Sequence, residues 1–433
     1  MLVFPIHVQT AQKSLNLTVV CKGGGKMMTK EKEQAAVVIL GTRNNECEEV
    51  KLVQELGYKA ILFDLRIELH EALAADFPLE IDLNNESLVI DEVEKLKNKF
   101  DIAGIYTLNE YRLTLCSKIS EILGFKNAMS HQGSINCRNK KFTRNALKGT
   151  RWEIKYKLIT HEKEVLNALE DFEFPVVVKP SNESGSSMVM KCNSFQDVWD
   201  AVSNIRMKKQ NLVGQMIDSD ILIEEYIEGS EYSVESFTIN NETTILAVTE
   251  KQTAHFNPTV EVGHIVPAPI KDKDFEEVSL LVKETLRLLN INNGVTHTEI
   301  KLTNNGPRLI EVNARPGGDR IPDLVATVTG IDLRKLSLQI ILGEIDQIKT
   351  AIKSSNFAAI RFLAAPKSGT LYYEMNDFNR SLHHSFFYHP GSKVSRTTSN
   401  YSRLGYFIVE GETYEDIKNK IKQTEEQLQI NIR

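Results

Sequence analysis

Two neighbouring stretches decide the fold: residues 296–302 read THTEIKL, and residues 307–319 read PRLIEVNARPGGD. Polar and apolar residues alternate in both, which predicts β-strands because successive side chains of a strand point to opposite faces. The sequence Asn-Asn-Gly at residues 304–306 lies between them and is typical of a hairpin turn. The sequence therefore predicts two adjacent antiparallel strands whose polar faces lie side by side.

The polar face of this hairpin carries a specific set of side chains. Glu299 shares a face with Lys301 on the first strand, and Glu311 shares a face with Asn313 and Arg315 on the second. Two carboxylates and an amide oxygen are ligands that a hard divalent cation such as Mg²⁺ prefers. The planar fork of an arginine suits a phosphoryl group that is being transferred.

A polar sheet edge that faces solvent would show the same alternation, and the alternation alone supports both interpretations equally. The residues that follow, Arg315-Pro-Gly-Gly-Asp-Arg320, favour a binding site. Two glycines directly after a polar strand let the backbone approach a ligand closely.

Two upstream segments supply candidate nucleotide contacts. FPVVVKP at residues 174–180 places Lys179 at the end of a buried strand, and a loop of small residues, Ser184–Ser187, follows. Backbone N–H groups of such a loop can surround phosphate oxygens, and a lysine adds positive charge. The apolar strand ILIEEYIEG at residues 221–229 can offer its backbone to an adenine edge, with Glu231 accepting hydrogen bonds from a ribose. Ordinary turns and a strand with exposed acids are the alternative interpretation.

Composition limits the classes of protein that fit. The 433 residues favour about three domains, and 41% hydrophobic with 25% charged residues is an ordinary globular balance. A net charge of −6 excludes a basic field over the whole chain for holding nucleic acid. No apolar run approaches the ~18 residues of a transmembrane helix. Five scattered cysteines without a C-x-x-C pair argue against a disulfide framework or a zinc site and favour the cytoplasm.

The order of the elements predicts an α/β fold with several parts. Apolar runs at 35–40 and 59–65 flank a helical stretch at 46–56, which is typical of a parallel, Rossmann-like sheet. The chain before this point has a glycine-rich break at residues 22–26, so we expect a linker, or a leader ahead of a start at Met28. The expected parts are a leader or flexible segment at 1–34, a Rossmann-like domain at 35–138, a small α+β lid at 139–228, a large α+β unit at 229–350 and a C-terminal β-rich portion at 351–433.

Six motifs follow one another in an order that points to a known family. They are NKKFTR (139–144), VVVKP (176–180), SGSS (184–187), EEYIEGSE (224–231), TEIKL (298–302) and LIEVNARPGGD (309–319). This succession resembles the ATP-grasp superfamily of carboxylate–amine ligases and extends from about residue 35 to 430. VGHIVPA (262–268) together with NARPGGD is most similar to L-amino acid ligases of the bacilysin-synthetase type and to carnosine synthase. The resemblance implies the ATP-grasp fold.

The resemblance also implies roles for individual residues. ATP would be bound by Lys140, Lys179, Ser184, Gly185, Ser186, Ser187, Glu224, Glu225, Ile227, Glu231 and Lys301. Two magnesium ions, with Mn²⁺ as an alternative, would be held by Glu299, Glu311 and Asn313. Arg315 would stabilise the γ-phosphoryl group and a later tetrahedral intermediate, and His264 would be a second catalytic residue that steers the substrate. The amino acid pocket would contain His264, Gly317, Gly318, Asp319 and Arg320.

Two positions depart from the family pattern. Asn139 stands where an aspartate usually precedes the lysine, and this leaves the predicted role of Lys140 unchanged. Ser187-Met188 stands where a second glycine or an arginine is common, which weakens the prediction for the loop contacts.

The activity that these roles imply is amide formation between an amino acid carboxylate and an amine, through an acyl phosphate, with release of ADP and phosphate. Three alternatives stay open: an antibiotic-pathway ligase whose acceptor is a carrier-protein thioester, an aminosugar or a diamino acid; a carboxylase of the biotin-carboxylase type; and an ATP-binding protein without catalysis. We expect small amino acids as partners, with an acyl-carrier protein as an alternative, and a homodimer through the first domain. No nucleic acid or membrane partner is expected.

Overall fold

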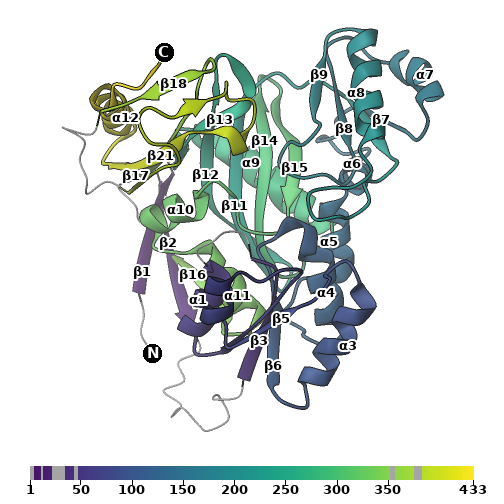
Figure 1. Ribbon diagram of the computed structural model, residues 1–433, viewed down its shortest axis with the longest axis vertical. Helices are drawn as coiled ribbons and strands as arrows, with labels where there is room; N and C mark the ends of the chain where they lie inside the picture. The colour runs from purple at the N-terminus through teal and green to yellow at the C-terminus, as the bar shows by residue number, and fades with distance from the viewer. Residues whose placement is uncertain (1–3, 11–12, 22–34, 43–46, 352–355, 375–382) are drawn as a thin grey trace.

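The N-terminal part is a parallel sheet, as the strand and helix pattern predicts (Figure 1). The computed structural model describes residues 4–10, 13–21, 35–42, 47–351, 356–374 and 383–433. The strands, in the order β5-β4-β3-β6, are β3 (Ala35–Leu40), β4 (Lys59–Asp64), β5 (Phe77–Glu80) and β6 (Asp101–Tyr106). The helices are α1 (Glu48–Glu55), α2 (Leu69–Ala74), α3 (Glu86–Leu96) and α4 (Leu113–Ile122). Every residue of β3 is buried because helices cover both of its faces.

The lid is a small antiparallel sheet with helices packed on it. Its strands, in the order β7-β10-β8-β9, are β7 (Tyr156–Ile159), β8 (Val176–Pro180), β9 (Met190–Cys192) and β10 (Ile221–Glu225). Val176, Val178 and Ile223 form its core with α7 (Val165–Leu169) and α8 (Phe195–Met207). Helix α6 (Lys140–Leu147), which follows α5 (His131–Arg138), contacts α9 and β15 of the central unit instead. Lys140 is thereby fixed to the central sheet, although the predicted lid began at residue 139.

The central unit is an eight-stranded sheet in the order β15-β14-β11-β12-β13-β17-β21-β19. Its strands are β11 (Ser230–Ile239), β12 (Glu242–Ala254), β13 (Asn257–Val266), β14 (Gly294–Thr303), β15 (Gly306–Asn313), β17 (Phe357–Leu363), β19 (His384–Phe386) and β21 (Gly405–Gly411). Helix α9 (Asp272–Leu288) packs on one face, and α10 (Ile321–Thr329) with α11 (Leu333–Ile341) packs on the other. The expected α/β architecture is confirmed.

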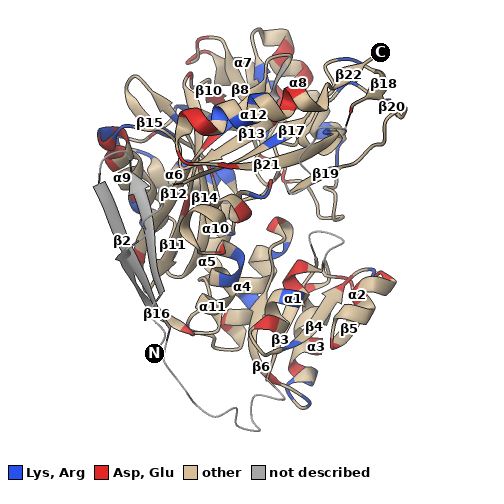
Figure 2. Ribbon diagram, turned by 90° about the vertical axis from the view of Figure 1, so that its left-hand side faces the viewer, with Lys and Arg blue, Asp and Glu red and all other residues tan. Residues whose placement is uncertain are grey.

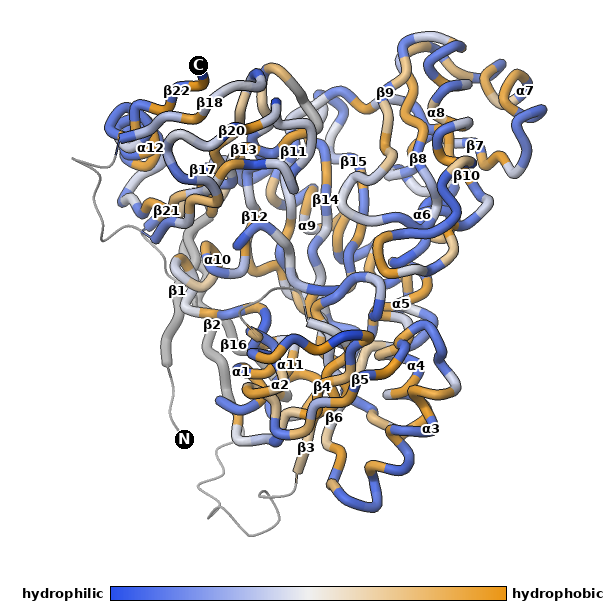
Figure 3. The backbone as a smooth tube through the Cα atoms, in the orientation of Figure 1, coloured by the Kyte–Doolittle hydropathy of each residue, from blue (hydrophilic) through white to orange (hydrophobic). Residues whose placement is uncertain are grey.

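The C-terminal β-rich portion continues the central sheet, since β17 pairs with β13 across the predicted boundary at residue 351. A smaller sheet of β18 (Gly369–Tyr372), β20 (Lys393–Val394) and β22 (Asn431–Ile432) lies beside it. Helix α12 (Tyr414–Leu428) packs on this portion through Ile417, Ile421 and Leu428. The two ends of α12 carry acidic residues and its middle carries lysines (Figure 2); it is largely hydrophilic in Figure 3, whereas β4 and β6 are largely hydrophobic. The domain boundaries themselves stay predictions.

The first segment differs from the expected flexible leader. Strand β2 (Lys13–Cys21) pairs with β1 (Phe4–Thr10) on one side and with β16 (Ile345–Ala351) on the other. The sequence holds a reason, because apolar residues alternate in FPIHV (4–8) and again in LNLTV (15–19). The predicted glycine-rich break at 22–26 lies outside the described residues. Within the described parts of the chain, no helix combines the length and apolar character that crossing a membrane requires.

Candidate active site

The predicted hairpin is present and aligns its polar residues. β14 and β15 pair antiparallel, with Glu299 directly opposite Glu311 and His297 opposite Asn313. These four side chains line one cavity of about 230 Å³. The expectation that two carboxylates and an amide oxygen converge therefore agrees with the geometry.

Each carboxylate of the hairpin faces a lysine from another element. Lys251 on β12 lies with Nζ 3.2 Å from Oε2 of Glu299, and Lys140 on α6 lies with Nζ 3.0 Å from Oε1 of Glu311. Both lysines are almost fully buried. The oxygen atoms of Glu299, Glu311 and Asn313 form a donor set without nitrogen or sulfur, which fits a hard divalent cation such as Mg²⁺.

Glu224, at the end of β10, lies between two cations. Arg144 donates from Nε to Oε1 at 2.8 Å and from Nη2 to Oε2 at 3.1 Å, and Nζ of Lys179 lies 2.7 Å from Oε2. Burial alone would raise the pKa of Glu224, but Arg144 and Lys179 lower it to about 2. Burial lowers the pKa of Lys179 to about 8, against the attraction of Glu224. Lys179, a predicted nucleotide ligand, therefore loses its charge within an accessible pH range.

A cavity of about 490 Å³ opens beside this group, between the lid and the central sheet. Predicted ATP ligands that line it are Lys179, Ser186, Glu224, Glu225, Ile227, Glu231 and Lys301. Nζ of Lys301 lies 3.1 Å from Oε1 of Glu231 and donates to the Ile227 carbonyl at 3.1 Å. Tyr226, which the sequence analysis did not single out, lies with its ring centroid 3.8 Å from Nζ of Lys191 and 4.8 Å from Nζ of Lys301.

The Ser/Gly loop reaches both cavities. Ser184, Gly185 and Ser186 line the 230 Å³ cavity, and Ser186 also lines the larger one, whereas Ser187 lines neither of the two. Gly185 and Ser186 have positive φ angles of 64° and 56°. Left-handed residues of this kind occur in loops whose backbone N–H groups face an anion. The loop thus stands where the two cavities adjoin.

Arg315 lines the smaller cavity and is held by a residue from the N-terminal domain. Its Nε lies 2.7 Å from Oε2 of Glu110, a buried residue in the 3₁₀ turn η2 (Glu110–Arg112). Its Nη1 donates to the carbonyl of Pro316 at 2.9 Å. The sequence shows a polar end to the strand before Glu110, but no local signal links that residue to Arg315.

A buried histidine of the hairpin, on β14, lies beside Glu299. Nδ1 of His297 lies 3.0 Å from both carboxylate oxygens of Glu235, and Nε2 lies 3.4 Å from Oε1 of Glu299. Burial by itself would lower the pKa of His297, but Glu235 and Glu299 outweigh this effect and raise the pKa to about 9. Gly317 packs against this ring, since a Cβ at that position would lie 2.8 Å from Nδ1. Gly317 therefore contacts His297, while Gly318 and Asp319 line the smaller cavity.

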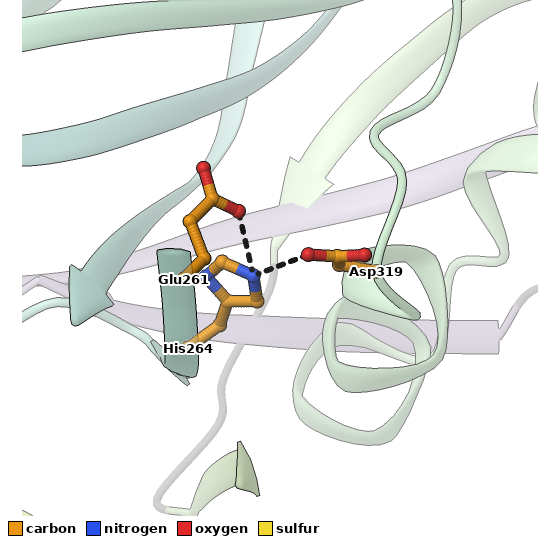
Figure 4. Close-up of side chains that lie close together, drawn as sticks. All are labelled: Glu261, His264 and Asp319. Carbon is orange, nitrogen blue, oxygen red and sulfur yellow. Dashed lines mark hydrogen bonds and ion pairs between the residues drawn. The ribbon is translucent and has the colours of Figure 1, made fainter. Parts of the chain in front are cut away.

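His264 is fully buried and lies between two carboxylates, with Nε2 3.5 Å from Oε2 of Glu261 and 3.4 Å from Oδ2 of Asp319 (Figure 4). One histidine and two carboxylates this close could hold a metal ion. Arg403, however, donates to both oxygens of Asp319 at 2.8 and 2.6 Å, and Lys251 lies 2.8 Å from Glu261. Because cations already balance both carboxylates, we interpret the cluster as a wall of the smaller cavity.

The position of Glu261 next to His264 could not be predicted from the sequence because β13 is irregular. Residues three apart in a regular strand point to opposite faces. The register between β12 and β13 shifts after Gln252, and this places Glu261 on the side of His264. Arg320, a predicted substrate residue, lines neither cavity: its Nη1 lies 3.2 Å from Oδ2 of Asp323.

Comparisons with known proteins agree with this geometry. Residues 172–323 match the ATP-grasp domain, and residues 361–433 match L-amino acid ligase C-terminal domain 2. The chain therefore contains an ATP-grasp domain. The resemblance seen in the motifs is thereby confirmed.

Individual relatives of this ATP-grasp chain are distant. Alanine–anticapsin ligase from Bacillus subtilis is 27% identical over 274 residues, which are 59% of this chain and 57% of that protein. The match thus spans little more than half the length of this relative. An L-amino acid ligase from Bacillus licheniformis has a crystal structure with a TM-score of 0.75 and 22% identity, over 93% of this chain and 99% of that one. The biotin carboxylase domain of 2-oxoglutarate carboxylase from Hydrogenobacter thermophilus, solved with MgADP, has a TM-score of 0.69 and 15% identity, over 92% and 90%.

The lowered pKa of Lys179 predicts that the use of ATP depends on pH. Its pKa is lowered from 10.5 to about 8, so the ammonium group that attracts phosphate is lost as the pH rises through about 8. We expect kcat/KM for ATP to fall severalfold in the free enzyme as the pH rises above that value. Lys179→Arg should remove this decline because a guanidinium stays charged. Initial rates of ADP release across the pH range would test this, and an identical decline in the arginine variant would contradict it.

Proposed function

We propose that the chain is an ATP-dependent carboxylate–amine ligase that forms an amide bond between an amino acid and an amine. The observation that carries this proposal is that the hairpin of Glu299 and Glu311 lies where the two cavities adjoin. The residues that the cavities share are Ser186, Lys251, Glu261 and Glu299. A nucleotide in the larger cavity and an amino acid in the smaller one would meet at the hairpin.

The larger cavity has suitable chemistry for ATP. The end of β10 and the residues after it carry the backbone groups of Glu225 and Ile227 at the cavity, where an adenine edge would find hydrogen-bond partners. Lys179 and Lys140 would bind the phosphates, and Glu231 would accept from the ribose hydroxyls. The Ser184–Ser187 loop would cover the triphosphate with its backbone N–H groups.

Magnesium would be held by Glu299, Glu311 and Asn313. We propose two ions, and Mn²⁺ would suit the same oxygen donors. When bound, the metal neutralises charge on the phosphate oxygens. His297 lies beside Glu299 on β14 and would hold that carboxylate in place.

The reaction would proceed in two steps. A carboxylate oxygen of the first substrate attacks the γ-phosphorus of ATP, the bond to the bridging oxygen breaks, and ADP leaves with its electron pair. The nitrogen of the amine then attacks the carbonyl carbon of the acyl phosphate and loses a proton, and phosphate leaves with the electrons of the C–O bond. Arg315 would stabilise the transferring phosphoryl group and then the tetrahedral intermediate. His264, with Asp319 and the glycines 317–318, would position the amino acid.

Two observations favour this reaction over the alternatives. The match to an L-amino acid ligase domain at 361–433 supports a ligase more than a bicarbonate-using carboxylase, which would leave the wall around His264 without a role. The complete oxygen set on the hairpin supports catalysis rather than nucleotide binding alone. The acceptor class, whether a free amino acid, a carrier-bound thioester, an aminosugar or a diamino acid, is decided by assay. A homodimer and a cytoplasmic location stay predictions.

The reaction class predicts a specific product. With MgATP and the correct pair of amino acids, we expect ADP and phosphate together with a compound whose mass is the sum of the two substrates minus water. Mass spectrometry after incubation with the common amino acids, singly and in pairs, would identify it. Bicarbonate-dependent ADP release, or bound ATP that never turns over, would contradict the proposal.

Glu311→Gln should lower the rate of ADP release at least ~100-fold, because a group that stabilises charge in the transition state contributes on that order. Glu426→Gln is a matched control, since it removes the same charge from the exposed side of α12. Both variants should unfold near the wild-type temperature, which circular dichroism would show. Wild-type ADP release by Glu311→Gln would overturn the assignment of the metal site.

A further inference from the structure

The wall of the smaller cavity is completed by a segment of the C-terminal portion. Asn400, Tyr401 and Arg403 line this cavity together with Ser184–Ser186 of the lid. No motif in residues 351–433 predicted a contribution to the site. Residues Ser399–Arg403, called the rim segment below, thus face the lid loop across the cavity.

Polar contacts fix the rim segment to the wall of the smaller cavity that Glu261, His264 and Asp319 form. Oδ1 of Asn400 accepts from the backbone N–H of Glu261 at 2.9 Å. Arg403 donates to both oxygens of Asp319 and, through Nε, to the carbonyl of Asn400 at 2.7 Å. The guanidinium of Arg403 also lies 3.6 Å from the ring centroid of Phe362. These contacts set the position of the backbone that carries Tyr401.

Tyr401 itself is in a different environment. Its side chain is 81% exposed although it is a large aromatic ring. It approaches the lid at Gly185, where an added Cβ would lie 3.1 Å from the phenol oxygen. Gly185 has a φ of 64°, so the backbone there is both left-handed and without a side chain at the point of approach. An exposed ring on a fixed backbone segment therefore approaches the loop that would cover the triphosphate.

The lid is also docked on the N-terminal domain. Nε2 of Gln215 donates to the carbonyl of Tyr111 at 2.9 Å, and Nδ2 of Asn84 donates to the carbonyl of Val213 at 2.8 Å. These hydrogen bonds tie the lid to the N-terminal domain. The approach of Tyr401 to Gly185 brings the lid next to the C-terminal portion as well, so the lid meets two other parts of the chain.

We infer that Tyr401 is a positioning residue that holds the Ser184–Ser187 loop over the cavity and so keeps water from the acyl phosphate. This inference rests on the proposed ligase reaction. Water that entered would attack the acyl phosphate, break its bond to phosphate and return the free carboxylate, so that ATP would be consumed without amide. A closed loop prevents this side reaction by excluding water.

The ratio of ADP released to amide formed tests the inference. In the wild-type protein this ratio should be close to unity, and in Tyr401→Ala it should rise severalfold while KM for ATP changes little. Tyr401→Phe should fall between the two, because it keeps the ring and loses the hydroxyl that approaches Gly185. Tyr388→Ala, which removes another exposed tyrosine of the C-terminal portion that lines neither cavity, should leave the ratio unchanged.

A second readout does not depend on the acceptor. Trypsin cleaves after lysine and arginine, and Lys191 follows the lid loop closely. With MgATP present, cleavage there should be severalfold faster in Tyr401→Ala than in the wild type or in Tyr388→Ala. Equal product ratios and equal cleavage in Tyr401→Ala and the wild type would overturn the role of Tyr401. Failure of the wild type to make any amide would overturn the ligase proposal instead, and cleavage alone would then decide whether Tyr401 holds the loop.

Discussion

Compensation of buried and partly buried carboxylates is the constraint on which the site depends. Carboxylates removed from water must be paired with cations, because an isolated buried charge is strongly unfavourable. Here the paired groups come from different parts of the chain: Glu224 with Arg144 and Lys179, Glu311 with Lys140, Glu299 with Lys251, and Asp319 with Arg403. These ion pairs therefore balance the charges of the carboxylates. They also hold the lid, helix α6, the central sheet and the C-terminal portion together at the two cavities.

This pairing also explains how the site can accept a highly charged ligand. Lys140 now faces Glu311, and Lys179 faces Glu224. If a metal ion bound Glu311 and a phosphate bound Lys140, each side chain would lose its present partner and gain a ligand of the same charge as that partner. The number of uncompensated charges would then not rise. A carboxylate whose pKa is held at about 2, as that of Glu224 is, stays ionised throughout and keeps Arg144 in place.

The sequence could predict the elements whose signals are local. The two-residue period of 296–302 and 307–313, with Asn-Asn-Gly between, led to the observed hairpin, and the motif order led to the fold. Contacts that depend on tertiary structure could not be read in this way. Glu110 meets Arg315 only after the first domain docks on the sheet, and Glu261 joins His264 only through a shift of strand register. Arg403 comes from a portion that carries no ATP motif, although it fixes Asp319.

The two halves of the site therefore carry different kinds of information. The part of the site that we propose binds the nucleotide consists of short segments. Phosphate and metal chemistry would restrict their residue types, so motifs describe this part well. The acceptor half is a composite of Glu110, the β13 irregularity and the rim segment, which are distant in the sequence. A shared fold restricts the residues of the proposed nucleotide site, whereas the residues around the acceptor can differ between proteins of that fold. If the chain is a ligase as proposed, the choice of the amine would then depend on side chains that no motif reports, in the region around Arg315 and His264.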